Sequence, residues 1–263
     1  MPDVTGFRAK MGVIVPSTNT VVESDFNDMR IPGVTFHAGR MYIERPALDS
    51  NETFEDLLKQ LRASIATAIR DVVTCKPDYM VMGMSAETFW GGLEGNRQFT
   101  ERVRKMSGGL GVSTGADACR AALEIYKCKR ISVLSPYQPI MREQIIKYFE
   151  DCGFKVVKYK DLKCPSATAI AEVRPEEVRP ELRELDGPDV DGIVQCGTNL
   201  SMVRLAAEAE NWLGKPVIAI NTATLWHAYR ANGFADKLYG FGSLLSGHEK
   251  GFIPSPPWGE RER

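Results

Sequence analysis

The stretch GVIVPSTNT, residues 12–20, is an apolar run that ends abruptly in small polar residues. Buried parallel strands show this pattern, because both of their faces are covered and polar residues begin only where the strand ends. The same pattern returns in ISVLSPYQP, residues 131–139, at an offset of 131 − 12 = 119 residues. The chain therefore contains an internal repeat of about half its length.

Two further pairs of segments follow in the same order. VTFHAGRM, from Val34, matches FKVVKYKD, from Phe154, and the segment around Asp78 (DYMVMGMSAE) matches the one around Asp191 (DGIVQCGTN). Stretches with helical spacing lie between the apolar runs: Thr53–Val73, Ala116–Lys127, Met141–Cys152 and Met202–Leu213. Regular alternation of strand and helix predicts parallel sheets with helices on both faces.

We therefore predict an α/β fold of two pseudo-symmetric Rossmann-like halves, each a parallel four-stranded sheet flanked by helices. The first half comprises residues 1–117 plus 223–263, and the second comprises residues 118–222. In such sheets ligands bind outside the carboxyl ends of the strands, so we expect the active site between the two halves.

The composition excludes several classes of function. With 33 Lys and Arg against 34 Asp and Glu, the net charge is −1, and no block of like charges indicates nucleic-acid binding. No apolar run approaches the roughly 20 residues of a membrane span or resembles a signal peptide, so we expect a cytoplasmic protein. No metal-ligand spacing, G-x-G-x-x-G motif or P-loop is present, so we expect no metal and no nucleotide cofactor. The expected partner is a small molecule.

Polar turns follow the strands of the first half. After the first strand come Pro16, Ser17, Thr18 and Asn19, whose hydroxyl and amide groups beside helix-starting N–H groups suit a carboxylate or phosphate. A plain helix cap is the alternative interpretation. Gly83, Met84 and Ser85 form a small-residue turn whose backbone N–H groups are able to approach a ligand closely.

The facing turn in the second half is Cys196, Gly197, Thr198 and Asn199. Cys196 ends a buried strand at the expected start of a helix, where the helix field lowers a thiol pKa and favours proton donation or nucleophilic attack. We interpret the other five cysteines as inert. Tyr137 follows another strand, where its hydroxyl either donates to a ligand oxygen or belongs to a packing aromatic ring.

The motifs GVIVPSTNTVVE, VMGMS, LSPYQP and IVQCGTN occur in this order between residues 11 and 242. In this they resemble the aspartate/glutamate racemase superfamily, and most closely the branch that holds arylmalonate decarboxylase and maleate cis-trans isomerase. The resemblance implies catalysis without metal or organic cofactor, a small carboxylic or dicarboxylic acid as substrate, and a homo-oligomer. Cys196 matches the second of the two racemase cysteines, and Gly83 falls where the first would be, so two-base racemisation lacks a thiol.

A glycine at the first position and one cysteine at the second resemble arylmalonate decarboxylase, whereas the turn with Asn19 resembles maleate isomerase. The leading expectation is a cofactor-independent decarboxylase of an (aryl)malonate-type acid, in which hydrogen-bond donors stabilise an enediolate and Cys196 protonates it. The expected catalytic residues are Cys196, Ser85 and Tyr137, and the expected substrate-binding residues are Pro16, Ser17, Thr18, Asn19, Gly83, Met84, Gly197, Thr198 and Asn199. The alternatives are a maleate isomerase-like enzyme with Cys196 as nucleophile and a non-catalytic dicarboxylate-binding protein.

Overall fold

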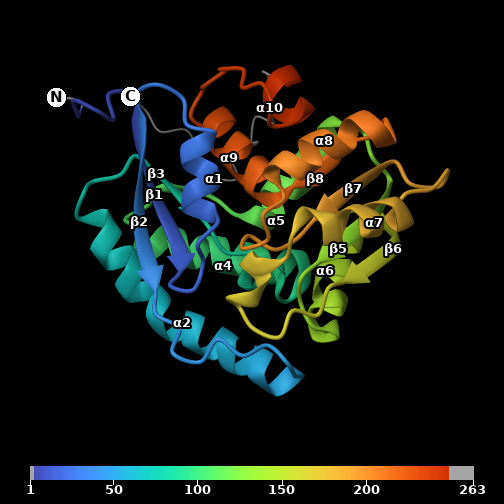
Figure 1. Ribbon diagram of the computed structural model, residues 1–263. Helices are drawn as coiled ribbons and strands as arrows, with labels where there is room; N and C mark the ends of the chain where they lie inside the picture. Colours follow the sequence, from blue (N-terminus) through green and yellow to red (C-terminus); the bar gives the residue numbers. More distant parts are fainter. Residues whose placement is uncertain (1–2, 249–263) are drawn as a thin grey trace.

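The computed structural model describes residues 3–248 and contains two parallel four-stranded sheets (Figure 1). The first sheet has the order β2-β1-β3-β4, with β1 Ala9–Pro16, β2 Val34–Met41, β3 Tyr79–Met82 and β4 Gly111–Ser113. The second has the order β6-β5-β7-β8, with β5 Arg130–Ser135, β6 Lys155–Asp161, β7 Gly192–Gln195 and β8 Val217–Ala219. The predicted α/β fold with two equivalent sheets is confirmed.

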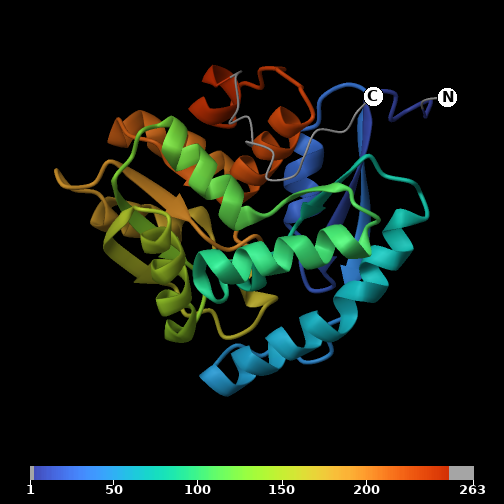
Figure 2. The same ribbon diagram turned by 180° about the vertical axis from the view of Figure 1, so that it is seen from behind.

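Helices cover the faces of both sheets, as the alternating pattern predicts. They are α1 Val22–Asp28, α2 Asn51–Val73, α3 Ala86–Phe89, α4 Gly92–Met106, α5 Gly115–Ile125, α6 Pro139–Asp151, α7 Pro175–Leu185, α8 Val203–Leu213, α9 Ile220–Ala231 and α10 Ser243–Gly247, with a 3-10 turn η1 at Ala169–Glu172. In the view from behind, α4 runs from the first half to α6 of the second, and the two helices are in contact (Figure 2). The expected boundaries at 117/118 and 222/223 fall inside α5 and α9, and this division stays a prediction.

The register of the central strands places the two polar turns in equivalent positions. Ile14 pairs with Met82 in the first sheet, and the next residue, Gly83, donates its N–H to the carbonyl of Ile14. In the second sheet Leu134 pairs with Gln195, and Cys196 donates its N–H to the carbonyl of Leu134 in the same way. The internal symmetry therefore relates Gly83 to Cys196, and by the same step Met84 to Gly197 and Ser85 to Thr198.

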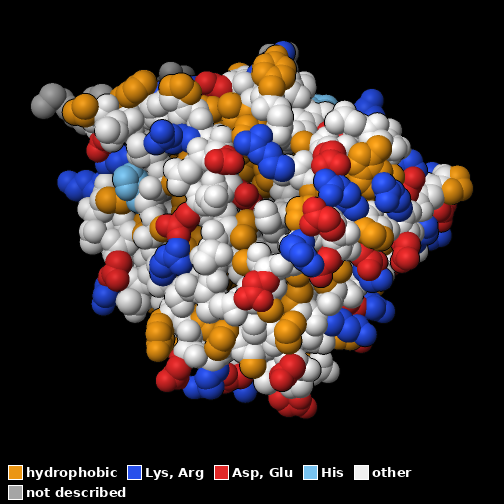
Figure 3. Space-filling view, in the orientation of Figure 1, with side chains coloured by type: hydrophobic (Ala, Val, Ile, Leu, Met, Phe, Trp, Pro, Cys, Tyr) orange, Lys and Arg blue, Asp and Glu red, His pale blue; other side chains and the backbone are white. Residues whose placement is uncertain are grey.

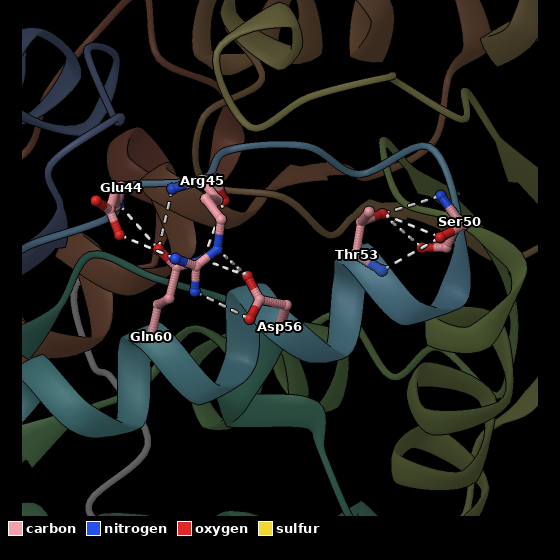
Figure 4. Close-up of polar contacts among 6 residues, drawn as sticks. All are labelled: Glu44, Arg45, Ser50, Thr53, Asp56 and Gln60. Atoms are coloured by element: carbon pink, nitrogen blue, oxygen red, sulfur yellow. Dashed lines mark hydrogen bonds and ion pairs between the residues drawn. The ribbon is translucent and has the colours of Figure 1, made fainter.

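The loop before α2 crosses to the second half. Leu48 donates its N–H to the carbonyl of Pro165, and Ala167 donates to the carbonyl of Pro46, so the two loops form a short antiparallel bridge. Figure 4 shows how the near end of this loop is held: Arg45 pairs with Asp56 on α2, and Gln60 accepts the N–H groups of Glu44 and Arg45. At the far end Ser50 and Thr53 form a reciprocal cap that starts α2. The loop is thus fixed at both ends.

The surface agrees with the charge pattern of the sequence. On the face in Figure 3, blue and red side chains alternate over both halves, with no continuous region of one sign. Among the described residues, no helix is both long and apolar enough to span a membrane.

Candidate active site

A cavity with an open mouth lies at the carboxyl ends of the strands between the two halves. Eight of its lining residues, most of them polar, end or follow strands of the two halves: Pro16, Thr18, Asn19, Met84, Ser85, Tyr137, Thr198 and Asn199. The structure therefore brings together eight of the twelve predicted site residues. Parallel strands present their turns at one edge, which is why a site assembled from distant segments follows from the fold.

Two buried hydroxyl groups meet in the floor of this cavity. The Oγ of Ser85 and the phenol oxygen of Tyr137 lie 2.5 Å apart, and either atom can be the donor. Ser85 Oγ also accepts the backbone N–H of Thr198 at 3.3 Å. Two hydroxyl groups hold two protons and share one hydrogen bond, so one O–H remains for a ligand. Burial raises the pKa of the Tyr137 phenol far above its ordinary value, so the phenol is un-ionised at neutral pH.

Thr198 connects the turns of the two halves. Its hydroxyl donates to the carbonyl of Gly83 at 3.2 Å and accepts the amide Nδ2 of Asn19 at 3.3 Å. Its own carbonyl accepts Nδ2 of Asn221 at 3.0 Å. With its N–H bound to Ser85, every polar group of Thr198 is used, so the turn has one defined position relative to the first half.

The two predicted asparagine ligands serve mainly to hold the turns. Asn19 Oδ1 accepts the N–H groups of Val21 and Val22, which lead into α1. Asn199 accepts the N–H of Thr20 and donates to the carbonyl of Ala167. Both side chains line the cavity, but their main hydrogen-bonding positions are already occupied by the protein.

Four predicted residues lie outside the cavity lining. The hydroxyl of Ser17 accepts the N–H of Ile43, which ties it to the loop after β2. A Cβ at Gly83 would meet Val15 Cγ1 at 2.4 Å, so this position faces the core. Gly197 has φ +158, and a Cβ there would lie 2.5 Å from Pro136, which leaves room only for glycine.

The fourth of these residues is Cys196, which is fully buried. Burial raises the pKa of its thiol well above the ordinary value, with a smaller contribution in the same direction from Cys119. The expected lowering by a helix start is wrong, because α8 begins only at Val203, seven residues further along the chain. Cys196 is therefore a neutral thiol, equivalent by symmetry to the core-facing Gly83.

The remaining lining residues form an apolar roof that the strand-end pattern does not predict. It consists of Leu48 in the crossing loop, Leu57 and Leu61 on α2, Ala86 on α3, Ala167 and Ile170. Apart from Ala86, which follows Ser85 in the turn after β3, these residues follow no strand, so the strand-end pattern does not indicate them. No charged side chain occurs among the described residues that line the cavity, and no cluster of metal-ligating side chains occurs in residues 3–248. The lining thus combines neutral hydrogen-bond donors with apolar side chains.

Comparisons with known proteins agree with this architecture. Residues 11–245 match the family model of arylmalonate decarboxylase. The chain is 27% identical to maleate isomerase of Pseudomonas putida over 90% of its own length and 97% of that protein. It superimposes with a TM-score of 0.81, at 24% identity, on a cysteine-to-serine variant of Nocardia farcinica maleate cis-trans isomerase, covering 90% of this chain and 97% of that one.

An arylmalonate decarboxylase structure superimposes with a TM-score of 0.73, at 21% identity, over 90% of this chain and 98% of that one. The family model covers most of the chain, in agreement with the resemblance to this branch of the aspartate/glutamate racemase superfamily. The chain therefore belongs to the arylmalonate decarboxylase family.

Proposed function

We propose that this protein is a cofactor-independent decarboxylase of a malonate-type acid with an apolar substituent. The observation that carries the proposal is the contact between Ser85 and Tyr137, which leaves one O–H for a ligand in a cavity lined by neutral donors. Such donors stabilise negative charge that develops on oxygen during a reaction, and in a site with little water this is usually the largest catalytic contribution.

The reaction proceeds in two steps. The bond between the α-carbon and the departing carboxylate breaks, its electron pair enters the enediolate of the remaining carboxyl group, and CO2 leaves. A proton is then added to the α-carbon. Leu57, Leu61 and Ile170 supply apolar surface that suits a neutral product better than a carboxylate.

We assign the proton to the Ser85–Tyr137 pair, which lines the cavity. Cys196, the donor expected from the sequence, is a neutral thiol and so has a proton to give, but it does not line the cavity. The donor used is replenished from solvent after each turnover. Replacing Tyr137 and Cys196 in turn shows which of the two groups donates the proton.

Maleate isomerisation is the second candidate, because four relatives at 21–27% identity are maleate isomerases. The Nocardia farcinica structure has a covalently bound succinylcysteine intermediate, so that reaction needs a thiol at the substrate. Here the thiol of Cys196 does not line the cavity. This placement favours decarboxylation over a reaction through a cysteine adduct.

The test is proton NMR in D2O with phenylmalonate, methylphenylmalonate, maleate and each enantiomer of aspartate and glutamate. We expect 2-phenylpropionate with one deuterium at the α-carbon from methylphenylmalonate, with a rate about 10² to 10³ lower in Tyr137→Phe and nearly unchanged in Cys196→Ala. Fumarate from maleate without decarboxylation would establish the isomerase instead. Loss of activity in Cys196→Ala, with activity kept in Tyr137→Phe, would identify the thiol of Cys196 as the proton donor. Tight binding without any product would indicate a non-catalytic protein.

A further inference from the structure

Asp25 on α1 lies outside the cavity but is connected to it through one side chain. Its Oδ2 accepts a hydrogen bond from Nδ2 of Asn221 at 2.7 Å, and the same Nδ2 donates to the carbonyl of Thr198 at 3.0 Å. An amide Nδ2 has two hydrogens, so both are used in these two contacts. The helices α1 and α9, which hold Asp25 and Asn221, pack against each other.

The other end of the Asn221 amide has no partner. Its Oδ1 is buried and accepts no hydrogen bond. A reversed amide would place this oxygen against the carbonyl of Thr198, and two acceptors in contact repel each other. An ionised carboxylate is purely an acceptor, so Asp25 favours the orientation in which Nδ2 faces it and Thr198.

We infer that Asp25 is a positioning residue of the candidate site, which acts through the amide of Asn221 on the backbone of Thr198. The held turn is the one that gives its N–H to Ser85, and Ser85 contacts Tyr137. The hydrogen-bonded path therefore leads from α1 to the hydroxyl pair. These contacts support the effect of Asp25 on the position of the turn. The effect of Asp25 on catalytic turnover rests on the proposed function.

The surroundings of Asp25 make the hydrogen-bonded path through Asn221 to Thr198 sensitive to pH. The pKa of its carboxyl group is raised to about 6, mainly by burial; the hydrogen bond from Asn221 opposes this shift, and the negative charge of Asp28 on the same helix adds to it. Arg204 on α8 lowers the pKa, and Arg40 on the neighbouring β2 pairs with Glu23. Below this pH, a protonated Asp25 donates to Asn221 Oδ1 if the amide reverses, which releases Thr198.

Hydrogen–deuterium exchange of the peptide that covers residues 196–200 tests the inference without a substrate. After correction for the intrinsic effect of pH, we expect the wild-type turn to exchange about tenfold faster at pH 5 than at pH 7.5, the size of one lost charge-assisted hydrogen bond. Asp25→Asn removes the titrating group at constant shape, so the pH step should vanish. The matched control is Asp28→Asn, on the same helix, where the step should persist with its midpoint at lower pH.

The inference would be overturned if the corrected exchange rate of the wild-type turn were the same at both pH values. It would also be overturned if Asp25→Asn kept the wild-type difference between the two pH values. The second readout is the pH–rate profile with methylphenylmalonate, whose acid limb near pH 6 should be present in the wild type and in Asp28→Asn and absent in Asp25→Asn. If no malonate is turned over, the proposed function fails, and the exchange measurement still decides the role of Asp25.

Discussion

The ring of Phe54 packs edge-on against the ring of Tyr137, with their centroids 5.6 Å apart. Phe54 belongs to α2, which follows the first-half strand β2, whereas Tyr137 follows β5 of the second sheet. The same tyrosine has its hydroxyl 2.5 Å from Ser85 Oγ. The direction of the phenol group therefore depends on a contact between the two halves.

Replacing Phe54 by leucine should impair catalysis more than stability. Leucine fills most of the buried volume but loses the edge-to-face contact, so we expect kcat to fall about tenfold and stability to fall by about 1 to 2 kcal/mol. The control is Phe154→Leu, another buried phenylalanine in an edge-on pair, with Phe149. Steady-state kinetics and urea unfolding should show a similar stability loss in both variants and a lower kcat in Phe54→Leu alone; equal kcat values would contradict the positioning role.

The Ser85–Tyr137 pair should behave as one unit in a double-mutant cycle. Because the two hydroxyl groups share a single hydrogen bond, Ser85→Ala and Tyr137→Phe should each lower kcat about 10² to 10³, and the double variant should lower it little further. The matched control is the buried pair of Ser113 and Tyr79, 3.1 Å apart and outside the cavity lining. Its removal should leave kcat unchanged. Fully additive effects at Ser85 and Tyr137 would show that the two hydroxyl groups act separately.

The strand-end positions could be predicted from the sequence, because the repeat at residues 12–20 and 131–139 identifies equivalent strands. The direction of each side chain at a strand end could not be predicted in this way. Gly83 and Cys196 each follow a strand directly, and one residue further along, Met84 lines the cavity. A shift of one residue reverses the side-chain direction, and the exact strand end decides it.

No pattern in the sequence predicts that the residues of the apolar roof line a cavity. Leu57 and Leu61 lie on α2, where their spacing also fits ordinary core packing, and Ile170 lies in a 3-10 turn of the other half. These side chains line one cavity, beside the bridge from the crossing loop to Pro165 and Ala167. A contact between such distant segments follows from tertiary packing, which local periodicity does not describe.

Cysteine substitutions at the first-half turn test the side-chain directions. A Cβ at Gly83 would meet Val15 at 2.4 Å and Val22 at 3.0 Å, so Gly83→Cys should cost about 1 to 3 kcal/mol and place its thiol in the core. Met84→Cys, its neighbour, should present a thiol to the cavity. Under native conditions iodoacetamide should modify residue 84 and leave residue 83 intact, as peptide mass spectrometry resolves. Rapid modification at 83 would show that the turn faces the other way.

Neutralising Asp25 should stabilise the protein at neutral pH. Its folded-state pKa of about 6 exceeds the ordinary value of 3.8, mainly because of burial, so the folded state binds the proton more tightly than the unfolded chain. Stability therefore falls as the pH rises from about 4 to about 6, and the ionised group lowers it throughout the range above. The difference in pKa corresponds to about 3 kcal/mol, which remaining solvent contact reduces to about 1 to 2 kcal/mol. Asp25→Asn should gain that amount at pH 7.5 and little at pH 4 in urea unfolding, whereas Asp28→Asn, an exposed neighbour, should gain almost nothing. An equal gain at both pH values would mean that the amide packs better than the carboxyl group and that ionisation of Asp25 has no part in the effect.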